Sequence, residues 1–534
     1  MNAATSTPLQ VVLPYNIFFP FTSLTTLTLA ISLYFVVVAF YRVFFSPLAA
    51  LPGPWYATVS DFWIITHVVR LRQCKTIQQL FDTYGPVVRI GPNKVAFCDV
   101  SSMRSVYFVH KFDKSNYYKS LLTNNNDHAM TTLPHAEHAI RKKAYSPHYN
   151  PSNLARFQPE LHEFSLKLVD TLDRLAGKTS VGCLDLFRHL MVDVISCTVF
   201  GSKPGSLDKY NMNIQDPLST AVYDFPKRGI LRSVVPEWAW SWVCSIPNAR
   251  FRQVCDSDRI MAEFVGNRLY ELRANIQASK AVGDVDYEKL PLLQRMMEQR
   301  DHMSDQNIIS EAMGHLVAGV DTTSTSLSYF LLELSRRPDI MAKLQAELDD
   351  AMPDRRVIPD ISVLSRLPYL NAFIKEGLRL YGAAPSLLER VVPSRSSSSV
   401  SKDDEDFDLM GYALPPNTIV ATQAWSMHRD PTVFLSPETF LPERWLAVDS
   451  SEMEEERLMR MAQQMMPFGA GARVCGGQNM AQMMLKIVVV AIARNFSISA
   501  NALETNDTSM EIKDAFVIFP ASMECKLSFH SRPQ

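Results

Sequence analysis

A single cysteine, Cys475, lies in the glycine-rich segment that most constrains what this chain can form. The segment reads Phe468-Gly-Ala-Gly-Ala-Arg-Val-Cys475-Gly-Gly477, and a helical run from Gln478 to Arg494 follows it. Glycines let a backbone approach a flat ligand closely. The N-terminus of the following helix directs N–H groups at the sulfur and favours its anionic form. The pattern therefore predicts a stabilised thiolate that faces a bulky partner such as heme.

Two other interpretations of this segment are weaker. Gly469 and Gly471 could open a dinucleotide-binding fingerprint, but Val474 occupies its last glycine position and no strand–loop–helix unit surrounds it. A purely structural cysteine is the second alternative, and the joint pattern argues against it. The eight cysteines form no C-x-x-C pair and no cluster with zinc spacing. Their low, irregular density is typical of a reducing compartment.

The N-terminal segment carries no charged residue before Arg42. From Ile17 to Tyr41 it is nearly all apolar or small, long enough to span a bilayer, and it lacks the charged start and cleavage site of a signal peptide. Basic residues follow the span, so the positive-inside rule places the rest of the chain in the cytosol. We expect a membrane anchor over residues 1–45 and one globular domain over 46–534. A buried core helix is the alternative.

The composition is that of an ordinary globular protein. Hydrophobic residues make up 47% and charged residues 20% of the 534 positions, and the net charge is −2. This excludes a disordered, collagen-like or disulfide-scaffold protein and gives no global attraction to nucleic acid.

The longest predicted helix runs from Ser304 to Arg336, with Ser304 as its cap. Its middle reads Ala318-Gly-Val-Asp-Thr-Thr323, a stretch of poor helix formers. A threonine hydroxyl there can bond the carbonyl one turn back and bend the helix. The result would be a small polar groove for a diatomic ligand and a water, where Asp321 and Thr322 suit proton delivery. A simple kink is the alternative.

A third motif, Glu376-Gly-Leu-Arg379, places an acid and a base on one helical face. Such a pair is common by chance, and the order of motifs gives it meaning. Phe440-Leu-Pro-Glu-Arg444-Trp follows, and then the cysteine segment. Arg444 could complete a buried Glu–Arg–Arg network that holds the cysteine loop from behind.

In this order, from Pro52-Gly-Pro54 to Gly477, the motifs resemble those of cytochrome P-450, a family of heme-thiolate monooxygenases. The resemblance implies a mainly α fold with small β-sheets, preceded by an N-terminal transmembrane helix. The anchor and its proline hinge are similar to the microsomal, eukaryotic branch, and the serine- and acid-rich stretch 394–408 tilts the assignment toward fungi.

The resemblance implies a role for each matching residue. Cys475 would be the proximal iron ligand, Thr322 and Asp321 would serve oxygen activation, and the structural triad would be Glu376, Arg379 and Arg444. Other residues would bind the heme: Phe468, Gly469, Gly471, Arg473 and Gly477 in the loop, His138 with Arg141 or Lys142, Arg390, and Ala318 with Gly319. The substrate pocket would be lined by Ala383, Ala384, Leu387 and Leu388 and by residues 116–130.

The same resemblance implies cofactors and partners. Heme b with a cysteine thiolate ligand would use O2 and electrons from NADPH, delivered by a membrane-bound flavoprotein reductase, with cytochrome b5 as a second donor. The location would be the endoplasmic reticulum membrane, with the catalytic domain cytosolic. One departure is visible, because Met484 stands where the family usually has Glu.

The expected activity is insertion of one oxygen atom into an apolar small molecule, by analogy in terpenoid or polyketide biosynthesis. A fatty-acid, sterol or xenobiotic hydroxylase of the same family is the alternative. An isomerase or dehydratase that needs no O2 and a non-enzymatic heme sensor are less favoured, because the Asp-Thr pair is intact and no output module is visible.

Overall fold

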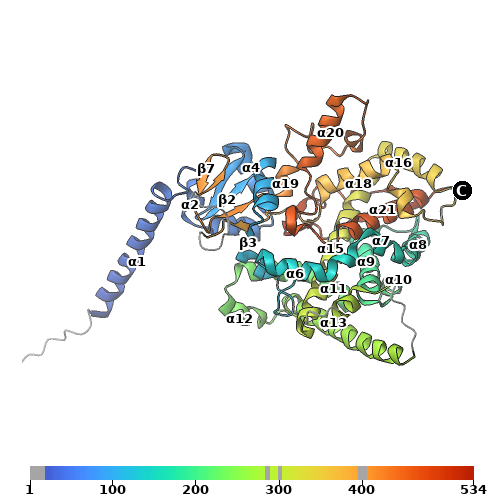
Figure 1. The fold of residues 1–534 in the computed structure, drawn as a ribbon, viewed down its shortest axis with the longest axis horizontal. Helices are drawn as coiled ribbons and strands as arrows, with labels where there is room; N and C mark the ends of the chain where they lie inside the picture. Colours follow the sequence, from blue (N-terminus) through green and yellow to red (C-terminus); the bar gives the residue numbers. More distant parts are fainter. Residues whose placement is uncertain (1–18, 283–288, 299–302, 395–405, 534) are drawn as a thin grey trace, which may run out of the picture.

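The computed structural model describes residues 19–282, 289–298, 303–394 and 406–533. Its first helix, α1 (Phe19–Phe44), extends away from the rest of the molecule at the left of Figure 1. The stretch Leu24–Phe44 has a mean hydropathy of 2.0, and none of it is buried against the protein. One helix of the described chain is therefore long and apolar enough to cross a membrane.

Helix α15 (Asp305–Arg336) passes through the middle of the molecule, as Figure 1 shows. The Ser304 hydroxyl caps it by accepting from the Asn307 N–H at 3.3 Å, which confirms the predicted start. The helix is apolar on most of its surface because other helices cover it on several sides. These are α9 (Cys183–Phe200), α11 (Pro217–Val234), α13 (Ala249–Val282), α14 (Leu292–Glu298), α16 (Pro338–Ala351), α18 (Pro368–Tyr381) and α21 (Gln478–Asn495). Helix α8 (Gln158–Leu175) packs against α9 and α21.

A five-stranded sheet lies on the anchor side of the molecule (Figure 1). Its order is β1–β2–β8–β5–β3, formed by β1 (Val87–Gly91), β2 (Lys94–Phe97), β8 (Ile419–Ala421), β5 (Arg390–Val391) and β3 (Asp113–Lys114). The antiparallel β1–β2 pair forms a hairpin around Gly91-Pro-Asn93. Strand β8 pairs parallel with β2 and antiparallel with β5, so segments more than 300 residues apart are brought together.

Shorter helices and strands complete the fold around the central helices and the five-stranded sheet. The helices are α2 (Trp55–Val59), α3 (Phe62–Val69), α4 (Gln73–Tyr84), α5 (Val100–Arg104), η1 (Ser105–Val109), η2 (Asn116–Leu121), α6 (His135–Tyr145), η3 (Ser146–Tyr149), α7 (Pro151–Leu154), η4 (Ala155–Phe157), α10 (Ser206–Asn211), η5 (Glu237–Ala239), α12 (Trp240–Cys244), α17 (Ile361–Leu364), α19 (Ala424–Met427), η6 (Pro442–Trp445), α20 (Glu452–Gln464) and η7 (Gly471–Arg473). The remaining strands are β4 (Val181–Gly182), β6 (Phe407–Leu409), β7 (Tyr412–Leu414), β9 (Phe496–Ser499), β10 (Ile512–Ala515), β11 (Val517–Pro520) and β12 (Lys526–Ser531).

The cysteine segment lies where two hydrophobic cores meet. Met466 and Ala470, before the cysteine, pack into the core of the sheet. The helix after it, α21, packs into the much larger helical core. Met484 is completely buried there, so an unpaired glutamate at this position would be costly. The fold is mainly α with small sheets, as predicted.

Candidate active site

The backbone of the cysteine segment forms a tight, glycine-dependent loop. The Cys475 N–H donates to the Phe468 carbonyl at 2.9 Å, which closes the loop. Gly469 and Gly471 have φ angles of +79° and +68°, which side-chain-bearing residues rarely adopt. A Cβ at Gly471 would also lie 2.0 Å from the Tyr107 carbonyl oxygen. The loop can therefore form only with glycine at this position.

The side chain of Cys475 is accessible at the surface of the loop. Of the eight cysteines, Cys475 alone is exposed. Surrounding protein atoms nevertheless raise the pKa of its thiol by desolvation, while the Gly477 backbone N–H and the Lys142 ammonium lower it. The N-terminus of α21 thus points a hydrogen-bond donor at the sulfur, as predicted from the helix position. The thiol can give a thiolate that faces outward from the loop.

A second exposed surface lies within helix α15. Ala318 is exposed and Thr322 half-buried, although the residues that follow them in the helix are almost all buried. The Thr322 Oγ1 hydroxyl donates to the Ala318 carbonyl at 2.6 Å, the back-bond expected from the sequence. The helix continues without a break through this stretch. A hydroxyl on an accessible face of a core helix is suited to contact a bound ligand.

The other residues of this motif face away from that surface. Asp321 is buried, and its Oδ1 accepts from the Nε of Arg188 on α9 at 3.0 Å. A Cβ at Gly319 would lie 2.5 Å from Cδ1 of Ile195, also on α9. Gly319, expected to contact the cofactor, is therefore placed where it allows α15 and α9 to approach closely. No motif marked Arg188, because its partner lies 133 residues away.

Basic side chains gather near the cysteine loop. The two terminal nitrogens of Arg473 donate to the Thr132 and Leu133 carbonyls at 2.9 and 2.6 Å. Burial, and after it the positive charge of Arg390, lowers the pKa of Arg473 to about 10. Burial, together with the positive charge of Arg473, lowers the pKa of His138 to about 3. The structure therefore brings three of the predicted heme-binding residues together around a surplus of positive charge.

The neighbouring bases Arg141 and Lys142 point in different directions. Lys142 Nζ donates to the Ala472 carbonyl at 3.2 Å, next to the cysteine. Arg141 instead reaches α15, where its Nη1 lies 3.4 Å from Oε2 of Glu311. The sequence left open which of the two meets the cofactor, and in this structure Lys142 is the one beside the loop. His315, one turn after Glu311, packs against Tyr145.

The Glu–Arg–Arg network forms as the motif order predicts. Glu376 Oε1 accepts from Nη2 of Arg379 at 2.8 Å and from Nε of Arg444 at 3.0 Å. Its Oε2 accepts from Nε of Arg379 and from the Trp445 indole, both at 2.9 Å. All four side chains are buried. Each charge is thus paired and hydrogen-bonded, the condition under which buried charges are tolerated.

His428 links this network to the cysteine segment. Nη1 of Arg379 donates to the His428 carbonyl at 2.9 Å, and the His428 Nδ1 bonds the Arg379 carbonyl at 3.0 Å. On the other edge of the ring, Nε2 accepts from the Met466 N–H at 2.8 Å. The network therefore does reach the loop from behind, but through a histidine that the sequence pattern did not single out.

The residues expected to line a substrate pocket divide between two faces. Leu387 packs into a core beneath the sheet with Ile77 and Phe81. Leu388 turns the other way, and its Cδ1 lies 3.8 Å from a Cβ built on Gly469. Successive side chains of extended backbone alternate in this manner, so only one of the two leucines faces the cysteine loop. Ala383 is buried and Ala384 is half-buried.

The segment 116–130 covers the first half of α15. Thr123 and Ser310 share a hydroxyl–hydroxyl hydrogen bond of 2.7 Å. The Ala129 N–H donates to both Glu311 carboxylate oxygens at 3.1 and 3.0 Å. The segment thus lies beside α15, and its expected place in the lining of a substrate pocket stays a prediction.

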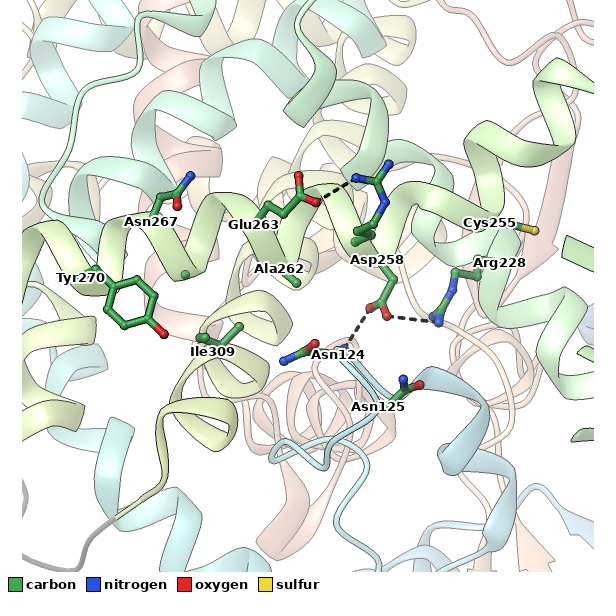
Figure 2. Close-up of a pocket in the computed structure, with 12 residues that line it drawn as sticks. Asn124, Asn125, Arg228, Cys255, Asp258, Ala262, Glu263, Asn267, Tyr270 and Ile309 are labelled. Atoms are coloured by element: carbon green, nitrogen blue, oxygen red, sulfur yellow. Dashed lines mark hydrogen bonds and ion pairs between the residues drawn. The ribbon is translucent and has the colours of Figure 1, made fainter. Parts of the chain in front are cut away.

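An open pocket of about 490 Å³ lies on another surface, between α13 and the turn at Asn124. Figure 2 shows the residues that line it. An ion pair of Arg228 and Asp258 at 3.2 Å forms part of its wall, and Asp258 also accepts from the Asn124 N–H at 3.0 Å. It contains neither Cys475 nor any residue of the Ala318–Thr323 stretch. The predicted chemistry therefore does not lie in this pocket.

The residues on the two exposed surfaces fit a large flat iron cofactor with acidic groups. Such a cofactor requires a thiol that can bind the metal, glycines whose missing side chains leave room for the ring, and basic residues that compensate its acidic groups. The family model of cytochrome P450 matches residues 52–527. The chain belongs to the cytochrome P450 family.

It is accordingly an oxidoreductase, a heme-thiolate monooxygenase that uses O2. Similar proteins include the fusicoccadiene C-8 hydroxylase of Alternaria brassicicola, 27% identical with 90% of each chain covered. The cytochrome P450 monooxygenase stcB of Emericella nidulans is 27% identical, covering 91% of this chain and 89% of that protein. The tryprostatin B 6-hydroxylase of Aspergillus fumigatus is 26% identical, covering 87% and 77%.

Proposed function

We propose that this protein hydroxylates an apolar, lipid-partitioning small molecule in fungal secondary metabolism, a terpenoid or polyketide. The observation that carries the proposal is the pair of accessible surfaces at Cys475 and at Ala318–Thr322. Relatives named as hydroxylases of fusicoccadiene and of tryprostatin B support the reaction type. Fatty acids, sterols and xenobiotics remain alternative substrates of the same chemistry.

Cys475 would hold the iron through its sulfur, and Arg390, Arg473, His138 and Lys142 would face the acidic edge of the heme. When bound, the heme supplies oxygen activation, which the electron-rich thiolate favours. Phe468 would pack beside the sulfur and limit access of water to it. The loop glycines set the distance of closest approach.

Thr322 would hold a proton on Oγ1 close to the bound oxygen, since its hydroxyl already lies on the accessible face of α15. Asp321 would supply that hydroxyl with protons from the other side of the helix. In this structure its carboxylate is held by Arg188, so the ion pair would have to open before Asp321 could take up a proton and pass it on. An O2-independent isomerase or dehydratase would have no need of this arrangement.

Electrons would come from NADPH through a membrane-bound flavoprotein reductase, with cytochrome b5 as a second donor. We assign residues 1–45 to an anchor in the endoplasmic reticulum membrane and 46–534 to a cytosolic catalytic domain. A second apolar feature supports membrane attachment: Trp238 and Trp242 are 71% and 70% exposed and meet edge to face at a centroid distance of 5.6 Å. Exposed tryptophans favour the membrane–water interface.

The test is the reduced, carbon-monoxide-bound difference spectrum of the full chain in microsomes, compared with Cys475→Ala. A thiolate-type, red-shifted Soret band that is lost in the variant is expected. A variant in the half-buried Cys98, Cys98→Ala, serves as the control and should keep the band. A wild-type protein that binds heme without this band would overturn the assigned ligand and the proposed reaction.

A further inference from the structure

Two buried cations face each other across a strand pair at the edge of the five-stranded sheet. Strand β3 pairs with β5 in the register Lys114 opposite Arg390. Directly opposed residues project from the same face of a sheet, and like charges in such pairs repel. Lys114 is only 8% and Arg390 only 3% exposed. The backbone pairing therefore holds two positive charges together away from water.

A third cation, Arg473 of the cysteine loop, joins them. The Leu133 carbonyl accepts both from the Lys114 backbone N–H at 3.3 Å and from Nη2 of Arg473 at 2.6 Å. The Lys114 ammonium itself donates to the Met130 carbonyl at 2.7 Å. Neutral carbonyls thus fix the positions of these bases without neutralising their charge.

Within the described parts of the chain, none of these three bases forms a salt bridge. Two acids lie nearby, and both have other partners. Glu389 pairs with Lys94 at 2.5 Å and accepts from Ser115 at 2.5 Å. Asp113 accepts from the His135 N–H at 2.7 Å. Burial and the charges of Arg390 and Arg473 together hold the pKa of Lys114 well below its usual range. A buried cluster of like charges is costly unless an anion compensates it.

Two polar atoms at the same place have no hydrogen-bond partner. They are the hydroxyl of Tyr118 and Nε of Arg473, both buried. Lys114 Nζ lies 4.3 Å from the centroid of the Tyr118 ring, which connects this tyrosine to the cation cluster. Buried donors are almost always satisfied, so two unsatisfied ones beside three cations indicate a ligand with several negatively charged acceptors.

We propose that Lys114 and Tyr118 bind the heme propionates together with Arg390 and Arg473. The proposal rests on the proposed function, because it needs heme at Cys475. Two carboxylates would compensate the three cations and accept from both unsatisfied donors. Lys114 belongs to no motif of the sequence and lies in strand β3. Tyr118 lies in η2, within the segment 116–130 that was expected to line the substrate pocket.

The experiment is heme release from the purified holoenzyme to an excess of apomyoglobin, followed in the visible spectrum. Lys114→Met removes the charge at nearly constant length, and Tyr118→Phe removes a single oxygen. Loss of a hydrogen bond to a charged group predicts release about ten- to a hundredfold faster in each variant. The exposed Lys111→Met, three residues before Lys114, is the matched control and should release heme at the wild-type rate.

A second readout separates binding from simple loosening of the fold. The propionate bending band in the resonance Raman spectrum of the holoenzyme should shift in Lys114→Met and in Tyr118→Phe, and Lys114→Arg should restore slow release. Wild-type release rates in both variants, or faster release with an unshifted band, would overturn the proposal. The thiolate band of the wild type would persist in either case, so the proposed function is tested separately.

Discussion

Asp321, the acid of the central helix, forms a buried ion pair with Arg188 of the neighbouring helix. Arg188 Nη2 lies 2.9 Å from Asp321 Oδ1, and the guanidinium also stacks on Tyr223 with its central carbon 3.9 Å from the ring centroid. Asp321 is only 6% exposed. The proposed proton donor is therefore held by a partner whose removal leaves a charge buried without compensation.

Arg188→Met should destabilise the protein by about 3–5 kcal/mol, because an uncompensated carboxylate then remains in the core. The double variant Arg188→Met/Asp321→Asn should regain much of this loss. Chemical denaturation of the four proteins in the cycle measures it. If the double variant is as unstable as the sum of the two single variants, the ion pair is not the cause.

Thr322→Ala should lower the ratio of product formed to O2 consumed on the order of tenfold, with oxygen diverted to hydrogen peroxide. The reason is loss of the Oγ1 hydroxyl on the accessible face of α15. Thr322→Ser keeps that hydroxyl and is the matched control. Oxygen uptake, peroxide and product are measured together, and unchanged coupling in the alanine variant contradicts the proton-relay role.

Gly471→Ala should prevent heme incorporation, because a Cβ there meets the Tyr107 carbonyl at 2.0 Å. Gly177 offers a matched comparison, since it has the same φ of +68° but nothing within 4 Å of its Cβ position. Gly177→Ala carries the same backbone strain without the collision. The ratio of heme to protein after purification should fall only in the Gly471 variant, and equal ratios would contradict the steric argument.

The buried acid Glu311 should make the stability of the folded protein depend on pH. Desolvation raises its pKa to about 7 from an ordinary value of 4.5, against the Ala129 N–H and Arg141, which lower it. The folded state therefore favours the protonated acid, and this contribution is fully present below pH 4.5 and is lost as the pH rises through 7. The shift corresponds to about 3 kcal/mol.

Glu311→Gln removes this titration. The melting temperature of the variant relative to wild type should rise between pH 4.5 and 7.5 and level off above. Hydrogen bonds from Lys513 and Lys75 lower the pKa of the half-buried Glu511 to about 2, so Glu511→Gln is a control with an acid that does not titrate in this range. A difference between Glu311→Gln and wild type that does not change with pH would mean that Glu311 does not titrate in this range.

The local patterns of the sequence were sufficient for the cysteine loop, the apolar helix α1 and the helix from Ser304. Each depends on neighbours within a few residues, where glycine conformation, apolar length and capping act directly. The Glu376 network was also predictable, because motif order supplied the missing long-range information. The direction of the Leu387 side chain was not predictable, because side chains alternate along an extended segment and only the folded sheet decides which of them face the cysteine loop.

The sequence by itself determined the ligand type, a thiolate at a helix N-terminus, and the class of chemistry that goes with it. Only the tertiary structure decided that Arg188 holds Asp321, that Lys142 and not Arg141 lies beside the loop, and that Lys114 faces Arg390. The residues of these pairs lie 133 to 330 positions apart in the sequence. Charge and burial act through space, so such contacts leave no trace in local spacing.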